Sequence, residues 1–258
     1  MVKAYFLSDI HLESDEDSNF FPLEKLLLKI AQDAQATHLF LLGDIFDLWM
    51  ADHVYFKRKF RRTLQALQKI QERGLKIHYF EGNHDLDLKP YFASSGFEVH
   101  EQALKTELGG KKFLIEHGDQ MDPSDRGYLF LRWFLRTAVM RRLGRALPGV
   151  VVQKIGNSMS STSRQYTDRL KKRLGEDAPA RRQKILEKIL AHVRRVRARE
   201  KDFDFFVSGH IHERFHEKLQ EEGKSFEVIN LGSWLGAEKP FGIYTEEEGF
   251  HFGCGEAL

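Results

Sequence analysis

Short apolar runs that alternate with amphipathic segments constrain the fold of this chain more than any other feature of its sequence. The runs have the length of buried strands, and the segments between them place apolar residues three and four positions apart, as helices do. Alternation of strands and helices predicts an α/β protein with a layered core. The runs read KAYFLSD, THLFLLGD, LKIHYFEGN, KKFLIEHGD, FDFFVSGH and FEVINLGS.

The middle of the chain differs from its two flanks in charge and in pattern. Residues 120–200 contain 20 Lys and Arg against 7 Asp and Glu, whereas the rest of the chain contains 20 basic and 31 acidic residues. The small formal net charge of +2 therefore hides a basic middle and acidic flanks. Long helical patterns with Arg between apolar residues fill the middle. We predict that residues 1–119 and 200–258 form one core and that residues 120–199 are a helical insertion.

Length and composition exclude several classes of protein. A chain of 258 residues with 41% hydrophobic content can bury a sizeable core. Its single cysteine, Cys254, excludes a disulfide framework and is typical of a reducing compartment. Its apolar runs are too short for a membrane span or a signal peptide. These features predict a cytoplasmic protein.

Residue types that bind metals follow five of the apolar runs directly. The carboxyl ends of strands in an α/β sheet face one crevice, so side chains that are distant in the sequence are expected to meet there. Two pairs are spaced i, i+2, which in an extended chain directs both side chains to one face. Carboxylate, amide and imidazole ligands together favour a pair of borderline divalent ions such as Mn, Fe, Zn or Co. The candidate ligands are Asp9, His11, Asp44, Asn83, His117, His210 and His212.

The motifs that contain these residues resemble a known family. In chain order, DIH, GDIFD, GNHD, HGD and GHIH are similar to the five blocks of the calcineurin-like metallophosphoesterases. The resemblance implies a four-layer αββα sandwich with two metal ions, and it implies that Asp44 bridges them. The other ligands implied are Asp9, His11 and His212 for one ion, and Asn83, His117 and His210 for the other.

Two residues of the GNHD motif are candidates for catalysis. His84 follows the ligand Asn83 and could donate a proton or a hydrogen bond to the oxygen on which charge develops. We expect Asp85 to orient His84. The sequence supports two interpretations of Asp47 equally, as a residue of the site and as a carboxylate in a loop. No role is predicted for the remaining histidines, which are expected to be packed or solvated: His38, His53, His78, His100, His192, His216 and His251.

A second resemblance narrows the substrate. GDIFDLW, HGDQMDPSDRGYLFLRWF and the basic insertion are similar to the UDP-2,3-diacylglucosamine pyrophosphatases of the bacterial lipid A pathway. The resemblance implies a helical lid, hydrolysis by metal-activated water to UMP and 2,3-diacylglucosamine 1-phosphate, and Mn²⁺ as the expected metal, with Zn, Fe or Co as alternatives. The substrate-binding residues implied are Asn83, His84, Asp125, Tyr128, Ser163, Arg164, Lys171 and His210.

The insertion also carries an apolar set of side chains beside its arginines. These side chains could line an acyl groove or rest on the anionic inner-membrane surface, which would make the protein peripheral to that membrane. The set consists of Phe130, Trp133, Phe134, Leu135, Val139 and Met140.

One departure from the lipid-enzyme pattern leaves alternatives open. That family reads GNRD where this chain has GNHD, and histidine is the general metallophosphoesterase residue. A phosphatase or phosphodiesterase acting on nucleotides or nucleic acid is the first alternative, with the basic insertion against the backbone. No aromatic RNA-binding signature is present, so a nucleic-acid partner is not expected. A non-catalytic scaffold is the second, which the complete ligand set disfavours. The sequence leaves the oligomeric state undetermined.

Overall fold

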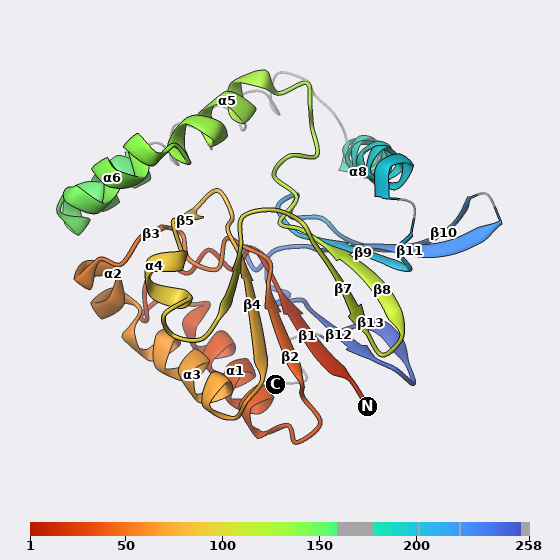
Figure 1. The fold of residues 1–258 in the computed structure, drawn as a ribbon, viewed down its shortest axis with the longest axis horizontal. Helices are drawn as coiled ribbons and strands as arrows, with labels where there is room; N and C mark the ends of the chain where they lie inside the picture. The colour runs from red at the N-terminus through yellow and green to blue at the C-terminus, as the bar shows by residue number, and fades with distance from the viewer. Residues whose placement is uncertain (159–177, 201, 222, 254–258) are drawn as a thin grey trace.

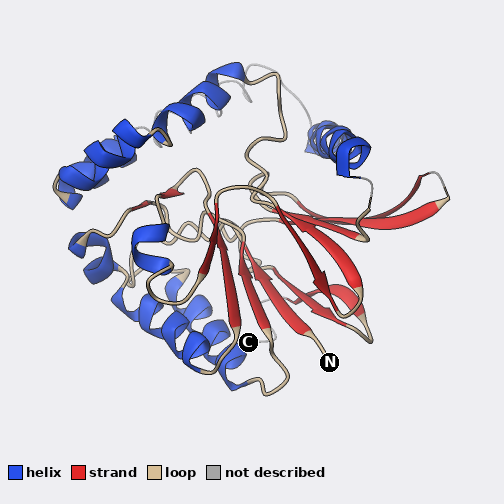
Figure 2. Ribbon diagram, viewed as in Figure 1, coloured by secondary structure: helices blue, strands red, loops and turns tan. Residues whose placement is uncertain are grey.

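Two β-sheets face one another in the middle of the molecule, and helices cover their outer faces (Figures 1 and 2). The computed structural model describes residues 1–158, 178–200, 202–221 and 223–253. Each of the six apolar runs contains a strand, and the expected α/β sandwich is confirmed. Among the described residues, no helix is both long and apolar enough to cross a membrane.

The first sheet has six strands in the order β13-β12-β1-β2-β4-β6. Strands β1, β2, β4 and β6 run parallel, whereas β12 pairs with β1 in the antiparallel sense. Parallel strands are the arrangement in which side chains after each strand gather at one edge. The bounds are β13 (Gly249–Gly253), β12 (Phe241–Thr245), β1 (Lys3–Leu7), β2 (His38–Leu41), β4 (Lys76–Phe80) and β6 (Glu98–His100).

The second sheet has five strands in the order β10-β11-β9-β8-β7, with β8, β9 and β11 parallel. Two further strands, β3 (Trp49–Met50) and β5 (Asp85–Leu86), form a small separate ladder. The second sheet thus adds the ends of three more parallel strands to the same edge. The bounds are β10 (Arg214–Glu221), β11 (Lys224–Leu231), β9 (Phe205–Ser208), β8 (Lys111–Ile115) and β7 (Leu104–Leu108).

Aromatic side chains fill the space between the two sheets. The ring of Phe6 on β1 stacks on Phe40 at 4.8 Å and lies 6.2 Å from Phe113 of the second sheet. All three are fully buried, so alternate residues of each strand supply this core while the others face the helices. Helices α1 (Phe20–Gln32) and α3 (Arg61–Glu72) pack on the outer face of the first sheet.

Helix α8 (Ala178–Glu200) covers the outer face of the second sheet (Figure 1). Its Ile189 and Val193 are buried in one cluster with Phe206 and Val228 of that sheet. The predicted insertion, residues 120–199, therefore includes most of a helix that forms the fourth layer of the sandwich. The amphipathic pattern of this helix reflects packing on the sheet, with its charged side toward solvent.

Two other helices, α5 (Arg126–Leu135) and α6 (Ala138–Ala146), cross over the strand ends at the top of Figure 1. We call residues 126–146 the α5–α6 segment. Ion pairs join its arginines to core carboxylates: Arg132 to Asp119 at 2.5 Å, Arg141 to Glu101 at 2.7 Å and Arg145 to Asp87 at 2.6 Å. The basic surplus of the middle thus meets the acidic surplus of the flanks. The short helices are α2 (Val54–Lys59) and α4 (Lys89–Phe92).

Candidate metal centre

The seven predicted ligands meet at the edge where parallel strands of both sheets end. They lie in the loops that follow β1, β2, β4, β8 and β9. Their ligand atoms form overlapping groups, each with atoms within 4.8 Å of one another. The groups are Asp9, His11 and His212; Asp44, His117 and His210; and His11, Asp44 and His84. The structure therefore brings together the residues that sequence reasoning selected.

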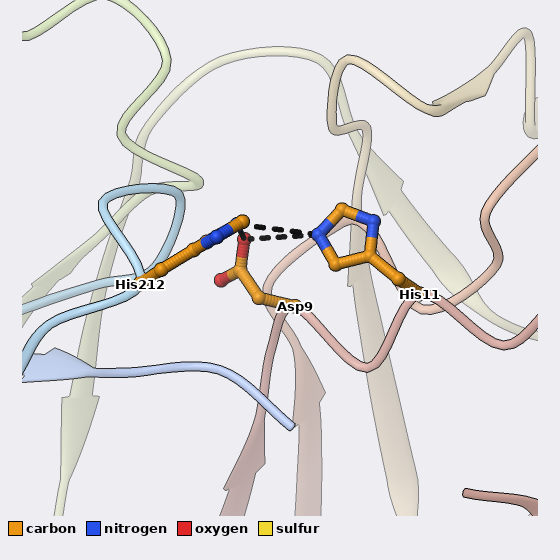
Figure 3. A group of neighbouring side chains, drawn as sticks. All are labelled: Asp9, His11 and His212. Carbon is orange, nitrogen blue, oxygen red and sulfur yellow. Dashed lines mark hydrogen bonds and ion pairs between the residues drawn. The ribbon is translucent and has the colours of Figure 1, made fainter. Parts of the chain in front are cut away.

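The first group is drawn in Figure 3, where Asp9 lies between two imidazoles that point toward one another. The Nε2 atoms of His11 and His212 are 3.2 Å apart. Oδ1 of Asp9 is 3.2 Å from Nε2 of His212 and 3.9 Å from Nε2 of His11. This oxygen is buried and has no hydrogen-bond partner in the described part of the chain. A buried carboxylate oxygen without a partner is costly unless a cation neutralises it, so this donor set fits a divalent metal ion.

The second group includes the amide of Asn83. Its Oδ1 atom is 3.0 Å from Nδ1 of His210 and 3.3 Å from Nε2 of His117. Oδ2 of Asp44 is 3.6 Å from Nε2 of His117 and 4.0 Å from Nε2 of His11. One oxygen of Asp44 therefore faces both groups, which is the position that a shared ligand would need.

Left-handed backbone conformations direct most of these ligands into the centre. A positive φ is rare for residues with a side chain and costs about 1–3 kcal/mol at each position. The pairs at i, i+2 are therefore not extended, contrary to the geometry assumed from the sequence, although their side chains do meet. The φ angles are 51° at Asp9, 50° at His11, 53° at Asp44, 69° at His210 and 63° at His212.

Two glycines leave room for the ligand carboxylates. A Cβ atom on Gly82 would lie 2.1 Å from Oδ1 of Asp44. A Cβ atom on Gly209 would lie 1.9 Å from Oγ of Ser8 and 2.5 Å from Oδ2 of Asp9. Any larger residue at either position would displace a carboxylate. The glycines in GNHD and GHIH are therefore required by the site and not only by the turns.

Burial and mutual charge set the pKa values of the histidines. Burial lowers the pKa of His11 to about 4, and burial together with the neighbouring His117 lowers the pKa of His210 to about 4. Burial alone would also lower the pKa of His117, but the surrounding carboxylates outweigh it and raise that pKa to about 9. The centre thus holds neutral and protonated imidazoles side by side.

The two buried carboxylates are held in their charged form. Burial alone would raise the pKa of Asp9, but the close approach of His212, whose Nε2 lies 3.2 Å from Oδ1, lowers it. Burial likewise opposes the charge on Asp44, and the nearby His117 lowers its pKa far below the ordinary value. The carboxylates in turn raise the pKa of His117 and, against the effect of burial, that of His212. Divalent cations held here would compensate the same negative charge, and their binding would displace protons from the imidazoles.

His84 belongs to the third group, with His11 and Asp44, and is oriented by Asp47. Its Nδ1 atom donates to the backbone carbonyl of Asp47 at 2.8 Å, and the carboxylate of Asp47 is 3.8 Å away. The ring stands edge-on to His11, with centroids 4.7 Å apart. A carbonyl can only accept, so Nδ1 carries a proton and Nε2 remains for a ligand in the centre. Asp47 is a site residue that sequence reasoning left undecided, and its signal is the second aspartate of GDIFD.

Asp85 does not orient His84, which corrects the role expected for it. Its carboxylate accepts hydrogen bonds from the backbone N–H groups of Asp44, Ile45 and Gly82 at 2.9, 3.0 and 2.9 Å. The hydroxyl of Tyr79 donates to it at 2.7 Å. The side chain is fully buried, so it ties the loop of Asp44 to the GNHD loop and does not face the imidazole.

Of the predicted substrate contacts beyond the metal ligands, Tyr128 lies at the centre, whereas Asp125 is an exposed helix cap. The ring of Tyr128 lies 6.0 Å from that of His210, and its hydroxyl donates to Asp119 at 2.9 Å. Asp125 is exposed and caps α5 by accepting from the N–H of Tyr128 at 2.9 Å. Asp119 and its partner Arg132 were not predicted, although the aspartate of HGD was a signal. Ser163, Arg164 and Lys171 lie outside the described residues.

An apolar cavity of about 190 Å³ opens beside Asn83 and His84, under the α5–α6 segment. Leu135 and Met140 from the predicted apolar set line it. Phe130, Trp133 and Val139 are instead exposed, at 63%, 62% and 72%. The apolar set therefore divides between an inner and an outer face of the segment. Further lining residues are Leu48, Met50, Leu86, Leu143, Gly144, Leu147, Val152, Ile155 and Gly156.

Comparison with known proteins identifies the family of this chain. Residues 2–214 match the calcineurin-like phosphoesterase family. UDP-2,3-diacylglucosamine hydrolases of Porphyromonas gingivalis and Pseudomonas entomophila are similar, at 29% identity over 90% of both chains and 28% identity over 95% of both chains. A solved structure of Vps29 from Entamoeba histolytica aligns over 98% of this chain and 97% of its own, with TM-score 0.42 and 12% identity. Both resemblances seen in the motifs are thus confirmed, and the chain belongs to the calcineurin-like phosphoesterases, as a metal-dependent hydrolase of phosphoric esters.

Proposed function

We propose that this enzyme hydrolyses the pyrophosphate of UDP-2,3-diacylglucosamine to UMP and 2,3-diacylglucosamine 1-phosphate. The observation that carries the proposal is the apolar cavity that opens beside Asn83 and His84, because it places room for a hydrocarbon chain next to a centre for phosphoryl chemistry. The two hydrolase relatives named for this substrate support the same reading. An apolar cavity next to a polar metal centre suits an acylated sugar nucleotide better than a nucleotide alone.

The two ligand groups would hold two divalent cations, with Mn²⁺ expected and Zn, Fe or Co as alternatives. Bound cations would polarise the phosphoryl oxygens and make water a nucleophile at neutral pH. Asn83 and His84 would contact the phosphoryl group, and Asp47 would hold the His84 ring with Nε2 toward it. A protonated His84 could then donate to the oxygen of the departing sugar phosphate. Tyr128, beside His210, would border the substrate on the α5–α6 side.

The paired arginines disfavour a polyanionic substrate. Arg132, Arg141 and Arg145 are each engaged by a core carboxylate, so their charge is already balanced within the protein. A surface that binds nucleic acid uses such residues for phosphate contacts. We therefore place the nucleotide and nucleic-acid alternative second.

Hydrolysis of UDP-2,3-diacylglucosamine in water enriched in ¹⁸O tests the proposal. Attack at the phosphorus next to uridine is expected to place the label in UMP and to leave the acylated sugar phosphate unlabelled, as read by mass spectrometry. A chelator should abolish the reaction, and added Mn²⁺ should restore it. Label in the sugar phosphate, or cleavage of nucleotides or nucleic acid but not of the lipid, would contradict the proposal.

Filling the apolar cavity should weaken binding of the lipid substrate selectively. Met140→Trp places a larger side chain into the cavity, and the KM for a diacylated substrate is expected to rise by about tenfold or more. The rate on a short, water-soluble phosphodiester should stay within about twofold, because the metal centre is untouched. Val139→Trp is the matched control, since the neighbouring Val139 points outward and is exposed. Equal effects of the two variants would argue against an acyl site here.

The outer face of the α5–α6 segment is proposed to rest on the anionic inner surface of the cytoplasmic membrane. Phe130 and Trp133 are exposed and lie 5.6 Å apart between ring centroids. Replacing both with Ser should reduce binding to vesicles containing anionic phospholipid by about tenfold or more, as measured by sedimentation. Phe21→Ser, which removes an exposed aromatic ring on α1, is the control. Unchanged vesicle binding by the double variant would count against this surface.

A further inference from the structure

Three side chains of metal-ligand type lie together outside the centre described above. His78 belongs to β4, whereas Glu98 and His100 belong to the neighbouring edge strand β6. His78 stands in register with Glu98, and the two strands are parallel. Residues i and i+2 of a strand share a face, and so does a register partner on the next strand. All three side chains therefore project to the same side of the first sheet.

The distances within this cluster are those of a zinc site. Nδ1 of His78 is 3.1 Å from Nε2 of His100 and 3.4 Å from Oε2 of Glu98. One ligand atom from each residue lies within 4.8 Å of the other two. Bonds of about 2.0–2.1 Å place the ligand atoms around a tetrahedral zinc ion roughly 3.3 Å apart. A cation could therefore enter with side-chain adjustments alone, while β4 and β6 keep their pairing.

Burial disfavours the protonated form of both imidazoles, and a metal ion binds the neutral form. Burial and the neighbouring His100, His38 and Lys76 lower the pKa of His78 to about 3. Burial also lowers the pKa of His100, although Glu98 acts in the opposite direction, and Lys89 adds a smaller lowering. The two rings now share one hydrogen bond between ring nitrogens. Moving that proton to the other nitrogen of the ring that donates it would keep both rings neutral and turn a lone pair of each ring toward a cation.

The cluster is open to solvent at Glu98. The side chain of Glu98 is 59% exposed, whereas that of His78 is buried. A cation can therefore arrive from solvent, bind the carboxylate and retain water as a further ligand. The negative charge of Glu98 would offset part of the charge of the cation, and the two lysines nearby would oppose it modestly.

We propose that His78, Glu98 and His100 form a further metal site that takes one Zn²⁺ or a similar borderline divalent cation. The site shares no residue with the centre at the strand ends and does not rest on the proposed reaction. The cation would join the edge strand β6 to β4. Glu101 follows β6 directly and binds Arg141 of α6, so this link would also steady the attachment of the α5–α6 segment.

Metal content after saturation tests the site in the whole protein. Wild type is incubated with Zn²⁺, passed through a desalting column and analysed for zinc per chain by mass spectrometry. His100→Gln and Glu98→Gln are expected to hold one zinc fewer than wild type, and titration should show that the affinity of this site falls by about tenfold or more. Because the result is a difference between variants, the occupancy of the other centre does not affect it.

His216→Gln is the matched control. His216 also pairs with a strand glutamate, Glu227 at 2.6 Å, but it belongs to no group of three ligands among the described residues. This variant should keep the zinc content of wild type. Equal zinc content in all four proteins would overturn the proposal.

A crystal soaked in Zn²⁺ provides a second measurement that does not depend on variants. Anomalous diffraction at the zinc edge should show a peak between His78, Glu98 and His100. Peaks confined to the centre of Asp9 and Asp44 would overturn the proposal while leaving the phosphoesterase site intact.

Discussion

Asp44→Asn is expected to reduce hydrolysis by at least about 10³-fold and to lower the metal content of the protein. The same oxygen of Asp44 faces His117 at 3.6 Å and His11 at 4.0 Å, so it serves both ligand groups. An amide keeps the shape of the side chain but removes the negative charge that the two proposed cations would share. Loss of one of these cations would remove several kcal/mol of stabilisation of the charge that develops on the phosphoryl oxygens, which corresponds to this factor in rate.

Activity and metal content of the Asp44 variant should be measured on the same preparation. Asp33→Asn is a matched control, because Asp33 also accepts hydrogen bonds from side chains, Tyr5 among them, but belongs to no ligand group among the described residues. It should leave both quantities near wild type. An Asp44 variant with normal turnover and two metal ions per chain would show that the two groups do not share this ligand.

His84→Gln is expected to slow turnover by about 10²–10⁴-fold while metal content stays at the level of wild type. The ring belongs to neither of the two groups proposed to hold the cations, although it lies 4.7 Å from His11 between centroids, and its orientation comes from the carbonyl of Asp47. Glutamine retains a polar group at this position but cannot donate a proton from a cationic form. The loss should therefore fall on kcat, and it should shrink for substrates whose leaving group needs no proton.

The control for His84 is His53→Gln. His53 also contacts a backbone carbonyl through a ring nitrogen, Gly144 at 2.8 Å, but it lies under α6 and outside the ligand groups. A fall in metal content on replacing His84 would reassign it as a ligand, which its place in a group with His11 and Asp44 allows. His84→Arg would add the residue of the lipid-enzyme pattern and should preserve KM better than kcat.

The ligands could be predicted because their position depends on topology alone. A polar residue after a parallel strand reaches the common edge whatever the details of packing, and this holds for Asp9, Asn83 and His117 alike. The backbone conformation of the ligand loops could not be predicted from the sequence. The positive φ at Asp44 and the backbone hydrogen bonds to Asp85 depend on neighbours that are distant along the chain.

Register between strands was a second limit. His78 and Glu98 are twenty residues apart, and nothing local shows that they become partners across β4 and β6. The amphipathic pattern of α8 has the same ambiguity, because an apolar stripe indicates that a helix is covered but not which surface covers it. Ile189 and Val193 find that surface on the second sheet. Residue type and order were thus sufficient to predict the metal centre. The pairing of His78 with Glu98 and the surface that covers α8 depend on tertiary structure.

The left-handed backbone conformations of the ligand loops make catalytic activity and folding stability compete at the same positions. Glycine adopts the backbone conformation at His11 and His212 more easily than histidine does. Replacing either histidine with glycine should therefore raise the free energy of unfolding while abolishing hydrolysis. Selection for turnover therefore keeps this edge of the protein below the stability that its backbone could reach. A descendant of this protein that no longer needs catalysis would be expected to lose these residues first and to gain stability as it does so.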